Sequence, residues 1–270
     1  MLSNYGAFHD PGEPADIDYS VGRHPSGGLY IARDQETQAE TGSDEAIRYT
    51  LVYLLEKLVA IDLQKLRTDL YFVHSAALER AGGAIMIAAE SGTGKSTTAW
   101  ALLQHGFRYL SDELAPVDPV TFDVHPYPHA LCLKAVPPGR YTLPEAVTQT
   151  ERTIHIPTAT LPSSVIKDPT PLRALIFLRR DTHTAEPAFA EASPAEAAAR
   201  LYANTLNALA HPDSGLDAAV RIAGAVPAFT VQAGDLQATC ELISELEERL
   251  RGSPPGAQSA ASLERSRHEH

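Results

Sequence analysis

The run from Ala84 to Gln104 constrains the fold of this chain more than any other segment. Its sequence, AIMIAAESGTGKSTTAWALLQ, joins an apolar strand-like stretch to a helix-like stretch through a loop of small residues. The loop at 89–96 departs from the pattern G-x-x-x-x-G-K-[ST] only in its first position, where Ala89 replaces Gly. That position requires a small side chain for a tight exit from the strand, so Ala is tolerated. The segment predicts a strand–loop–helix unit inside an α/β domain.

This loop has the properties of a phosphate-binding loop. Such loops turn backbone N–H groups toward an anion, direct a helix N-terminus at it and supply a Lys. We expect Lys95 to contact the β and γ phosphates of a nucleoside triphosphate and Ser96 to bind Mg²⁺. A Gly-rich turn with a surface Lys is the alternative, but it would have to explain the pattern and both flanks together. The residues expected to form the phosphate cradle are Ser91, Gly92, Thr93, Gly94, Lys95, Ser96 and Thr97.

An acidic pair, Asp112-Glu113, follows closely behind the loop. Asp112 comes sixteen residues after Ser96, which leaves room for one helix, one turn and a short strand at 107–110. Both carboxylates would then lie at the carboxyl end of a strand, beside the terminal phosphate. One could hold Mg²⁺ and the other could accept the proton of an attacking hydroxyl. A solvated acidic turn is the alternative, which the pair taken alone would favour.

Three segments together resemble one known family. HSAAL at 74–78, ESGTGKST at 90–97 and GFRYLSDELAPVD at 106–118 resemble the compact relatives of HPr kinase/phosphorylase. PYPHALCLK at 126–134 resembles the proline-and-lysine segment of those short relatives. The resemblance implies an α/β fold in which helices flank a mixed β-sheet that contains a P-loop. This fold is shared by the C-terminal domain of HPr kinase and by phosphoenolpyruvate carboxykinase.

The resemblance also implies roles for individual residues. Asp112 is the catalytic carboxylate that takes the hydroxyl proton, Glu113 assists the metal, and Lys95 and His74 complete the catalytic set. His74 would orient or tune the groups near the γ-phosphate; the alternative for it is a core histidine bonded to the backbone. The departures from the family are Ala89, Glu113 in place of a second Asp, and the lack of a separate N-terminal domain. The second signature, tied to phosphorylase activity, has no convincing copy, so kinase activity carries over better than dephosphorylation.

The expected activity is therefore ATP- and Mg²⁺-dependent transfer of the γ-phosphoryl group to a hydroxyl, that of a serine in a peptide or protein. Some compact family members modify precursor peptides in natural-product pathways, which makes such a peptide one expected substrate. A small-molecule kinase on the same scaffold stays open, as does a nucleotide-gated regulatory ATPase or binding module. An ATPase would need a carboxylate directly after a later apolar strand, and Asp181 follows Leu178 too distantly. The candidate cations for the transition state are Lys134, Arg140, Arg179 and Arg180.

Charge and composition argue against several other classes. The chain has 22 Lys and Arg against 34 Asp and Glu and a formal net charge of −12, without a basic run. Such a balance disfavours nucleic acids and anionic membranes as partners. The apolar stretch at 84–89 is too short to cross a bilayer, and no secretory signal is recognisable. Cys132 and Cys240 lack metal-ligand spacing and fit a reducing compartment. We expect a cytoplasmic protein; a homo-oligomer is one option, because hexamers occur among the founding relatives.

The order of patterns predicts three parts of the chain. Residues 1–69 form an N-terminal strand-and-helix segment packed on the core, with residues 1–18 loosely ordered and a helix capped by Ser43. Residues 252–270 are a disordered tail by composition. Residues 70–251 form the kinase core, with strands at 70–78, 83–88, 107–110, 174–178 and 226–231 and helices at 96–105, 193–210 and 235–250.

Overall fold

The computed structural model describes residues 2–8, 12, 14–25, 27–40, 47–150, 152–180 and 186–251. The chain divides into two compact units. Residues 9–68 form the smaller unit, and the larger unit begins at Asp69 and also includes the N-terminal residues up to Phe8. The predicted tail at 252–270, the helix cap at Ser43 and the position of Asp181 lie outside the described residues.

The smaller unit combines an antiparallel meander with one long helix. Its elements are β1 (Tyr19–Arg23), β2 (Leu29–Arg33), β3 (Glu36–Glu40) and α2 (Ile47–Leu66). Ile31 of β2 is buried together with Leu51 and Leu55 of α2. The two leucines are four positions apart, so they lie on the same helix face and can both pack on the strand. The run GLYIAR at 28–33, which follows a Gly-Gly turn, predicts a short strand, and β2 confirms it. The predicted helix is confirmed as well, whereas β1 and β3 have no counterpart among the predicted strands.

The larger unit is built around a mixed β-sheet. Within the described residues, its central strands follow the order β15 (Ala228–Ala233), β13 (Thr170–Arg180), β6 (Gly83–Ala89), β5 (Ser75–Arg80) and β7 (Arg108–Ser111). β13 is parallel to β6 and to β15, and β5 is antiparallel to β6 and to β7. β6, β7, β13 and β15 therefore run in the same direction. Their carboxyl ends meet at one edge of the sheet.

Short strands extend this sheet on both sides. They are β14 (Ala188–Ala192), paired with β15, and β9 (Asp123–Val124), β8 (Ala115–Val117) and β4 (Tyr71–Val73), which continue from the first residues of β13. A separate antiparallel sheet has the order β10 (Leu131–Leu133), β12 (Ile154–Ile156), β11 (Thr148–Gln149). The many prolines of residues 116–171 predict short strands and loops there. This region supplies parts of two different sheets.

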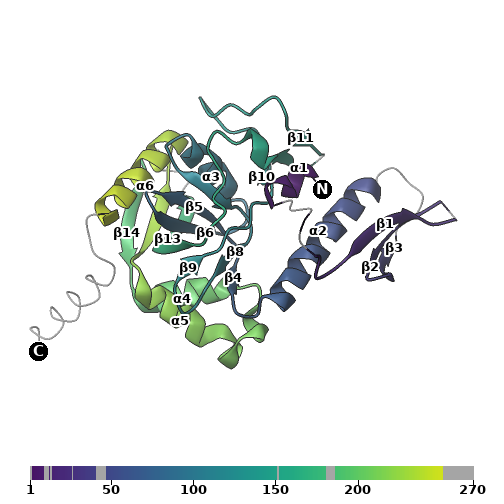
Figure 1. Ribbon diagram of the computed structural model, residues 1–270. Helices are drawn as coiled ribbons and strands as arrows, with labels where there is room; N and C mark the ends of the chain where they lie inside the picture. The colour runs from purple at the N-terminus through teal and green to yellow at the C-terminus, as the bar shows by residue number, and fades with distance from the viewer. Residues whose placement is uncertain are drawn as a thin grey trace, which may run out of the picture. The chain divides into compact units, whose positions relative to one another are not determined.

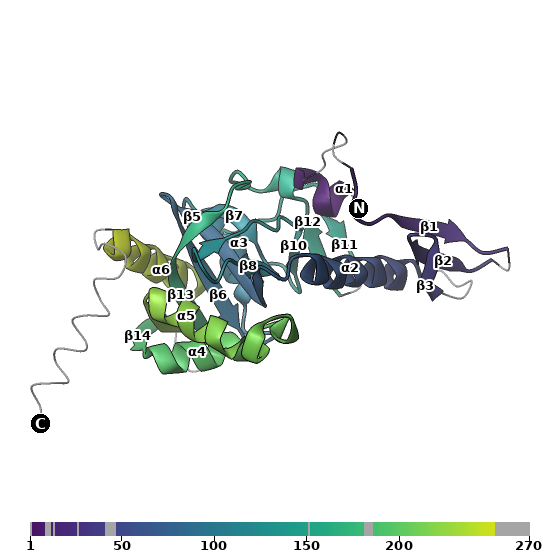
Figure 2. The ribbon, with the colours of Figure 1, turned by 60° about the horizontal axis from the view of Figure 1, so that its bottom comes forward.

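Helices cover both faces of the main sheet (Figure 1, Figure 2). One face carries α3 (Lys95–Leu103) and α6 (Leu236–Arg251), and the other carries α4 (Pro194–Ala203) and α5 (Leu216–Ala225). Alternation along β6 gives each face its own core, because Ile87 belongs to the buried cluster that includes Leu102 of α3, while Met86 belongs to the cluster that includes Ile222 of α5. The expected mixed sheet flanked by helices is confirmed. Among the described helices, none combines the length and the apolar character that crossing a bilayer would require.

The N-terminal residues differ from the prediction. Residues 2–8 form α1 (Leu2–Tyr5) and the 3-10 turn η1 (Gly6–Phe8), where a loosely ordered segment was expected. The carbonyl of Asn4 accepts a hydrogen bond of 2.8 Å from the backbone N–H of Ala130, and the Tyr5 ring lies 4.9 Å from the His129 ring. These partners are more than a hundred positions away, so local composition could not reveal them.

The strand expected at 70–78 is also wrong, because the chain breaks at His74 into β4 and β5. The backbone N–H of His74 donates to the carbonyl of Asn204 at 2.8 Å instead of to a neighbouring strand. At this residue the chain changes from pairing with β8 to pairing with β6 and β7. The break leaves His74 at the amino end of β5, at the edge where β6 and β7 end.

α4 begins as its sequence predicts. Ser193 Oγ accepts a hydrogen bond of 3.2 Å from the N–H of Glu196, and Pro194 occupies the first turn. The spacing of Ser193 and Glu196 also predicts a capping box, in which the Glu196 side chain bonds back to the Ser193 N–H. That part of the prediction is wrong, because the Glu196 carboxylate pairs with Arg200 at 2.6 Å. The helix ends at Ala203, so the predicted continuation to residue 210 is wrong. Two 3-10 turns, η3 (Ala208–Ala210) and η4 (Pro212–Gly215), lead from it to α5.

We predict that Leu102→Ala lowers the free energy of unfolding by about 2–5 kcal/mol, because it leaves a cavity between α3 and the sheet. Leu102 is 0% exposed. Leu209→Ala is a matched control, since Leu209 is 91% exposed, and it should change stability by no more than about 0.5 kcal/mol. Urea denaturation followed by circular dichroism measures both variants. Equal effects would show that α3 does not pack on the sheet in solution.

Candidate active site

Strand register brings the predicted site segments to one sheet edge. Ser75 at the start of β5 lies opposite Ala88 near the end of β6, and Ala77 lies opposite Ser111 at the end of β7. The predicted site residues therefore lie close together at this edge although they are distant in sequence. The residues that come next in the three segments are His74, Glu90 and Asp112.

The loop at 90–94 has a backbone that requires glycine. Gly92 and Gly94 have φ angles of 88° and 111°, in the left-handed region that side chains with a Cβ rarely adopt. A Cβ added at either glycine would meet nothing within 4 Å, so the backbone conformation and not the packing requires glycine. Ala89 is still paired with Leu178 of β13. The first position of the loop therefore stays in strand geometry, which explains why Ala suffices there.

α3 begins directly after this loop, so the N-terminus of the helix faces the loop. Gly94 is the N-cap, and the N–H of Thr98 makes a 2.8 Å hydrogen bond to its carbonyl. Within the described residues no side chain caps this end, in contrast to Ser193 at the start of α4. The N–H groups of Lys95, Ser96 and Thr97 precede the first intrahelical bond and lie at the positive end of the helix dipole. This arrangement suits a phosphate group.

Lys95 and Asp112 form a buried ion pair at the centre of the site. Lys95 Nζ lies 3.5 Å from Asp112 Oδ1 and also donates to the backbone carbonyl of Asp112. The two side chains are 9% and 1% exposed. Asp112 Oδ2 accepts a 3.3 Å hydrogen bond from the backbone N–H of Cys132. A buried carboxylate without such partners would be strongly unfavourable, so these contacts hold Asp112 in a defined orientation.

His74 is half-buried beside this pair. Burial lowers the pKa of His74 below its ordinary value of 6.5, and the charge of Lys95 lowers it further, while Glu113 and Asp112 act in the opposite direction. The net result is a lowered pKa, so the imidazole is neutral at pH 7. A neutral imidazole offers one donor and one acceptor nitrogen. His74 can therefore orient another group without adding positive charge.

The two carboxylates of the acidic pair lie in different environments. Asp112 is buried, whereas the next residue, Glu113, is exposed. Ser96, in the first turn of α3, is partly exposed. Within the described residues, no group of three or more His, Cys, Asp or Glu side chains could enclose a metal ion. Mg²⁺ in phosphoryl-transfer sites uses only one or two protein ligands and completes its shell with phosphates and water, which Ser96 and Glu113 fit.

Of the four candidate cations, Lys134 is the one that contacts the loop. Its Nζ donates a 2.9 Å hydrogen bond to Ser91 Oγ. Arg140 instead lies 3.2 Å from the His105 ring nitrogen and over the Tyr141 ring. Arg179 and Arg180 are exposed at the carboxyl end of β13, on the same sheet edge as the loop.

Some features of the site have no counterpart in the sequence analysis. The hydrogen bond from the Cys132 backbone to Asp112 comes from β10, for which the sequence shows no strong periodicity. The lysine of PYPHALCLK was one candidate among four, and only the fold brings it to Ser91. Two further hydroxyls, those of Ser75 and Ser111, are buried next to His74 and Asp112 and have no hydrogen-bond partner within the described residues.

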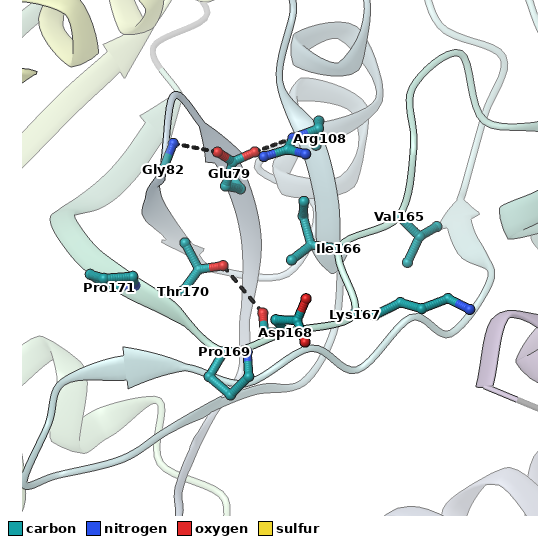
Figure 3. A pocket seen from close by; sticks show the side chains of 10 residues that line it. All are labelled: Glu79, Gly82, Arg108, Val165, Ile166, Lys167, Asp168, Pro169, Thr170 and Pro171. Carbon is teal, nitrogen blue, oxygen red and sulfur yellow. Dashed lines mark hydrogen bonds and ion pairs between the residues drawn. The ribbon is translucent and has the colours of Figure 1, made fainter.

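A surface hollow of about 460 Å³ lies away from this site (Figure 3). It is lined by Glu79, Gly82, Arg108 and residues 165–171. Gly82 belongs to the turn between β5 and β6, at the sheet edge opposite the loop. The buried carboxylate of Glu79 in this hollow is already paired, because it accepts a 2.6 Å hydrogen bond from the N–H of Gly82 and forms an ion pair with Arg108. The hollow therefore takes no part in the site described above.

Comparison with known proteins gives little beyond the site itself. No family model and no curated protein matches the chain. Among solved structures, the HPr(Ser) kinase/phosphatase from Coxiella burnetii is similar, with 13% sequence identity, coverage of 74% of this chain and 99% of that chain, and a TM-score of 0.33. A likeness at this level is at most a distant relation of fold, and it does not show what this chain binds or does.

We predict that His74 makes wild-type stability fall more steeply toward acid pH than that of His74→Gln. The folded pKa of His74 lies below its unfolded value, so the unfolded chain binds the proton more readily. The contribution of the neutral imidazole is fully present above the unfolded pKa and is lost as pH falls through the folded pKa. Denaturant titrations between pH 5 and 8 measure the difference between the two proteins. A difference that does not change with pH would show that His74 is not desolvated beside Lys95.

Proposed function

We propose that this protein is an ATP- and Mg²⁺-dependent kinase that transfers the γ-phosphoryl group to a hydroxyl, and that the acceptor is a serine of a peptide or protein. The observation that carries the proposal is the buried Lys95–Asp112 pair at an uncapped helix N-terminus. A phosphate loop alone suits any nucleotide-binding protein. A buried carboxylate beside the loop is, in addition, what transfer to a hydroxyl requires.

The loop and the first turn of α3 are the proposed phosphate cradle, formed by the backbone from Ser91 to Thr97. Lys95 would share its three ammonium donors between Asp112 and the phosphates. Ser96 and Glu113 are the proposed Mg²⁺ ligands. When bound, the metal would neutralise part of the charge on the phosphates.

Asp112 is the proposed general base. Its Oδ1 faces Lys95 and its Oδ2 accepts a hydrogen bond from the Cys132 N–H, so the carboxylate is oriented before an acceptor arrives. The acceptor hydroxyl would pass its proton to this carboxylate as the hydroxyl oxygen bonds to the γ-phosphorus, while the bond from that phosphorus to the β–γ bridging oxygen breaks and ADP leaves. His74, neutral and adjacent, is the proposed orienting group for the acceptor or for Asp112.

We expect Asp112→Asn to lose transfer by about 10²–10⁴-fold, the usual contribution of a general base, while nucleotide binding is retained. Lys95→Ala should lose both transfer and most nucleotide affinity. Asp217→Asn is the matched control, because Asp217 is exposed at the start of α5, and it should behave as wild type. Transfer is measured with γ-labelled ATP and binding by calorimetry. Near-normal turnover by Asp112→Asn would show that another group takes the proton.

The acceptor class is identified with γ-labelled ATP, candidate peptides and mass spectrometry. Nucleotide turnover that requires a serine peptide, with label recovered on that serine, supports the proposal. Label on a small hydroxyl compound alone would instead identify a small-molecule kinase. Turnover stimulated by a protein that never gains phosphate would identify a regulatory ATPase and contradict the proposal.

Lys134 is the proposed cation for the transferring group, because its ammonium already lies at the loop. Lys134→Ala should lower transfer by roughly 10²-fold, in the range seen when one charge-stabilising donor is removed, with a smaller effect on nucleotide affinity. Lys167→Ala is the control, because Lys167 is exposed and lines the hollow at the opposite edge. Single-turnover measurements separate binding from transfer. Equal rates for the two variants would exclude this role for Lys134.

A further inference from the structure

A cysteine, a histidine and a threonine are connected by hydrogen bonds in the sheet formed by β10, β12 and β11. Antiparallel pairing sets Cys132 of β10 directly opposite His155 of β12. Cys132 Sγ lies 3.2 Å from His155 Nδ1, and His155 Nε2 lies 2.9 Å from Thr153 Oγ1. A nucleophile, a base and a group that orients the base thus lie in a row, connected by hydrogen bonds.

The threonine can select the tautomer of the imidazole. If Nε2–H donates to Thr153 Oγ1, then Nδ1 is left as the acceptor that faces the thiol. Thr153 is itself held by Thr150, whose Oγ1 lies 2.9 Å from Thr153 Oγ1 and accepts a 3.0 Å hydrogen bond from the Thr153 N–H. The orientation of His155 toward Cys132 therefore depends on Thr153, which is itself hydrogen-bonded to Thr150.

We infer that Cys132 and His155 form a reactive thiol site that takes small disulfides, and that its modification disturbs the neighbouring Asp112. The proton of Cys132 moves to His155 Nδ1, which gives a thiolate beside an imidazolium. The thiolate attacks one sulfur of the disulfide; a new S–S bond forms to Cys132 as the original S–S bond breaks. The departing thiolate takes the proton from His155. The small disulfide is the oxidant, so no further reactant is needed.

The two cysteines of the chain contrast in their surroundings. Cys132 is partly exposed, whereas Cys240 is fully buried, with an exposed fraction of 0%. Burial raises the pKa of the Cys240 thiol to about 12, which disfavours the reactive thiolate. Cys240 is therefore an inert thiol within the same molecule, against which the reactivity of Cys132 can be measured.

Cys132 itself connects the thiol site to the proposed active site. The backbone N–H of Cys132 is the donor to Asp112 Oδ2 at 3.3 Å. A substituent on Sγ adds volume next to that hydrogen bond, so it should displace the strand or the carboxylate. This consequence rests on the proposed function, whereas the reactivity of the thiol does not.

The first test measures thiol chemistry alone. The full chain is incubated with oxidised glutathione at pH 7.5, and mass spectrometry follows the adducts on both cysteines. We expect Cys132 to react well before Cys240. His155→Gln and Thr153→Val should slow the Cys132 reaction by roughly tenfold or more, as loss of base assistance requires, and Thr153→Ser should react as wild type. Unfolding of a variant would instead speed the reaction of both cysteines.

Two outcomes would overturn the thiol site. One is a Cys132 rate no faster than that of Cys240 in the wild-type protein. The other is a Cys132 rate that His155→Gln leaves unchanged while Cys240 stays protected. Labelling decides this point even if the chain transfers no phosphate.

The second test examines the effect on Asp112. Modification of Cys132 should lower phosphoryl transfer at least tenfold, and dithiothreitol should restore it. Transfer by Cys132→Ser should not respond to oxidised glutathione. Full activity with Cys132 completely modified would overturn the coupling between the thiol and Asp112. Absence of transfer in the unmodified protein would instead contradict the proposed function.

Discussion

The ion pair between Lys95 and Asp112 connects the start of α3 to the end of β7, and the rest of the site depends on it. Both charges are almost completely buried, so each requires the other to offset its desolvation. They meet because β5 lies between β6 and β7 and runs antiparallel to both. The two outer strands then end at the same sheet edge. A lysine that follows one strand can reach a carboxylate that follows the other.

His74 lies beside this ion pair because β5 begins there. The chain cannot continue as one strand from β4, since β4 and β5 pair with different neighbours. The break brings an imidazole to the edge where the cation and the carboxylates lie. Its lowered pKa, caused first by burial and then by Lys95, keeps it neutral beside the ion pair. The site therefore contains a cation, a buried carboxylate, an exposed carboxylate and a neutral imidazole within one sheet edge.

The sequence predicted the elements with local signals and missed those that depend on distant partners. β6, α3 and β7 follow from an apolar run, two glycines and a second short run, and α4 follows from its Ser193 cap. The break at His74 depends on Asn204 and the ordering of residues 2–8 depends on Ala130, neither of which a local pattern reveals. The roles of Asp112, His74, Lys95, Ser96 and Glu113 remain predictions.

Three further interactions were inaccessible to sequence reasoning for the same reason. Lys134 meets Ser91, and Cys132 meets both Asp112 and His155, through strands too short to show a period. Lys134, Cys132 and His155 all come from the region between β9 and β13. That region thus contributes more to the surroundings of the site than its loop-like composition indicates.

The most direct test of the central claim is a crystal structure of the full chain with Mg²⁺ and a non-hydrolysable ATP analogue. We predict that the terminal phosphate contacts Lys95 Nζ and the N–H groups of the loop. Asp112 should face the phosphorus, with room between them for one acceptor hydroxyl that is hydrogen-bonded to the carboxylate. A nucleotide bound elsewhere, or a terminal phosphate on the side of the loop away from Asp112, would contradict the account.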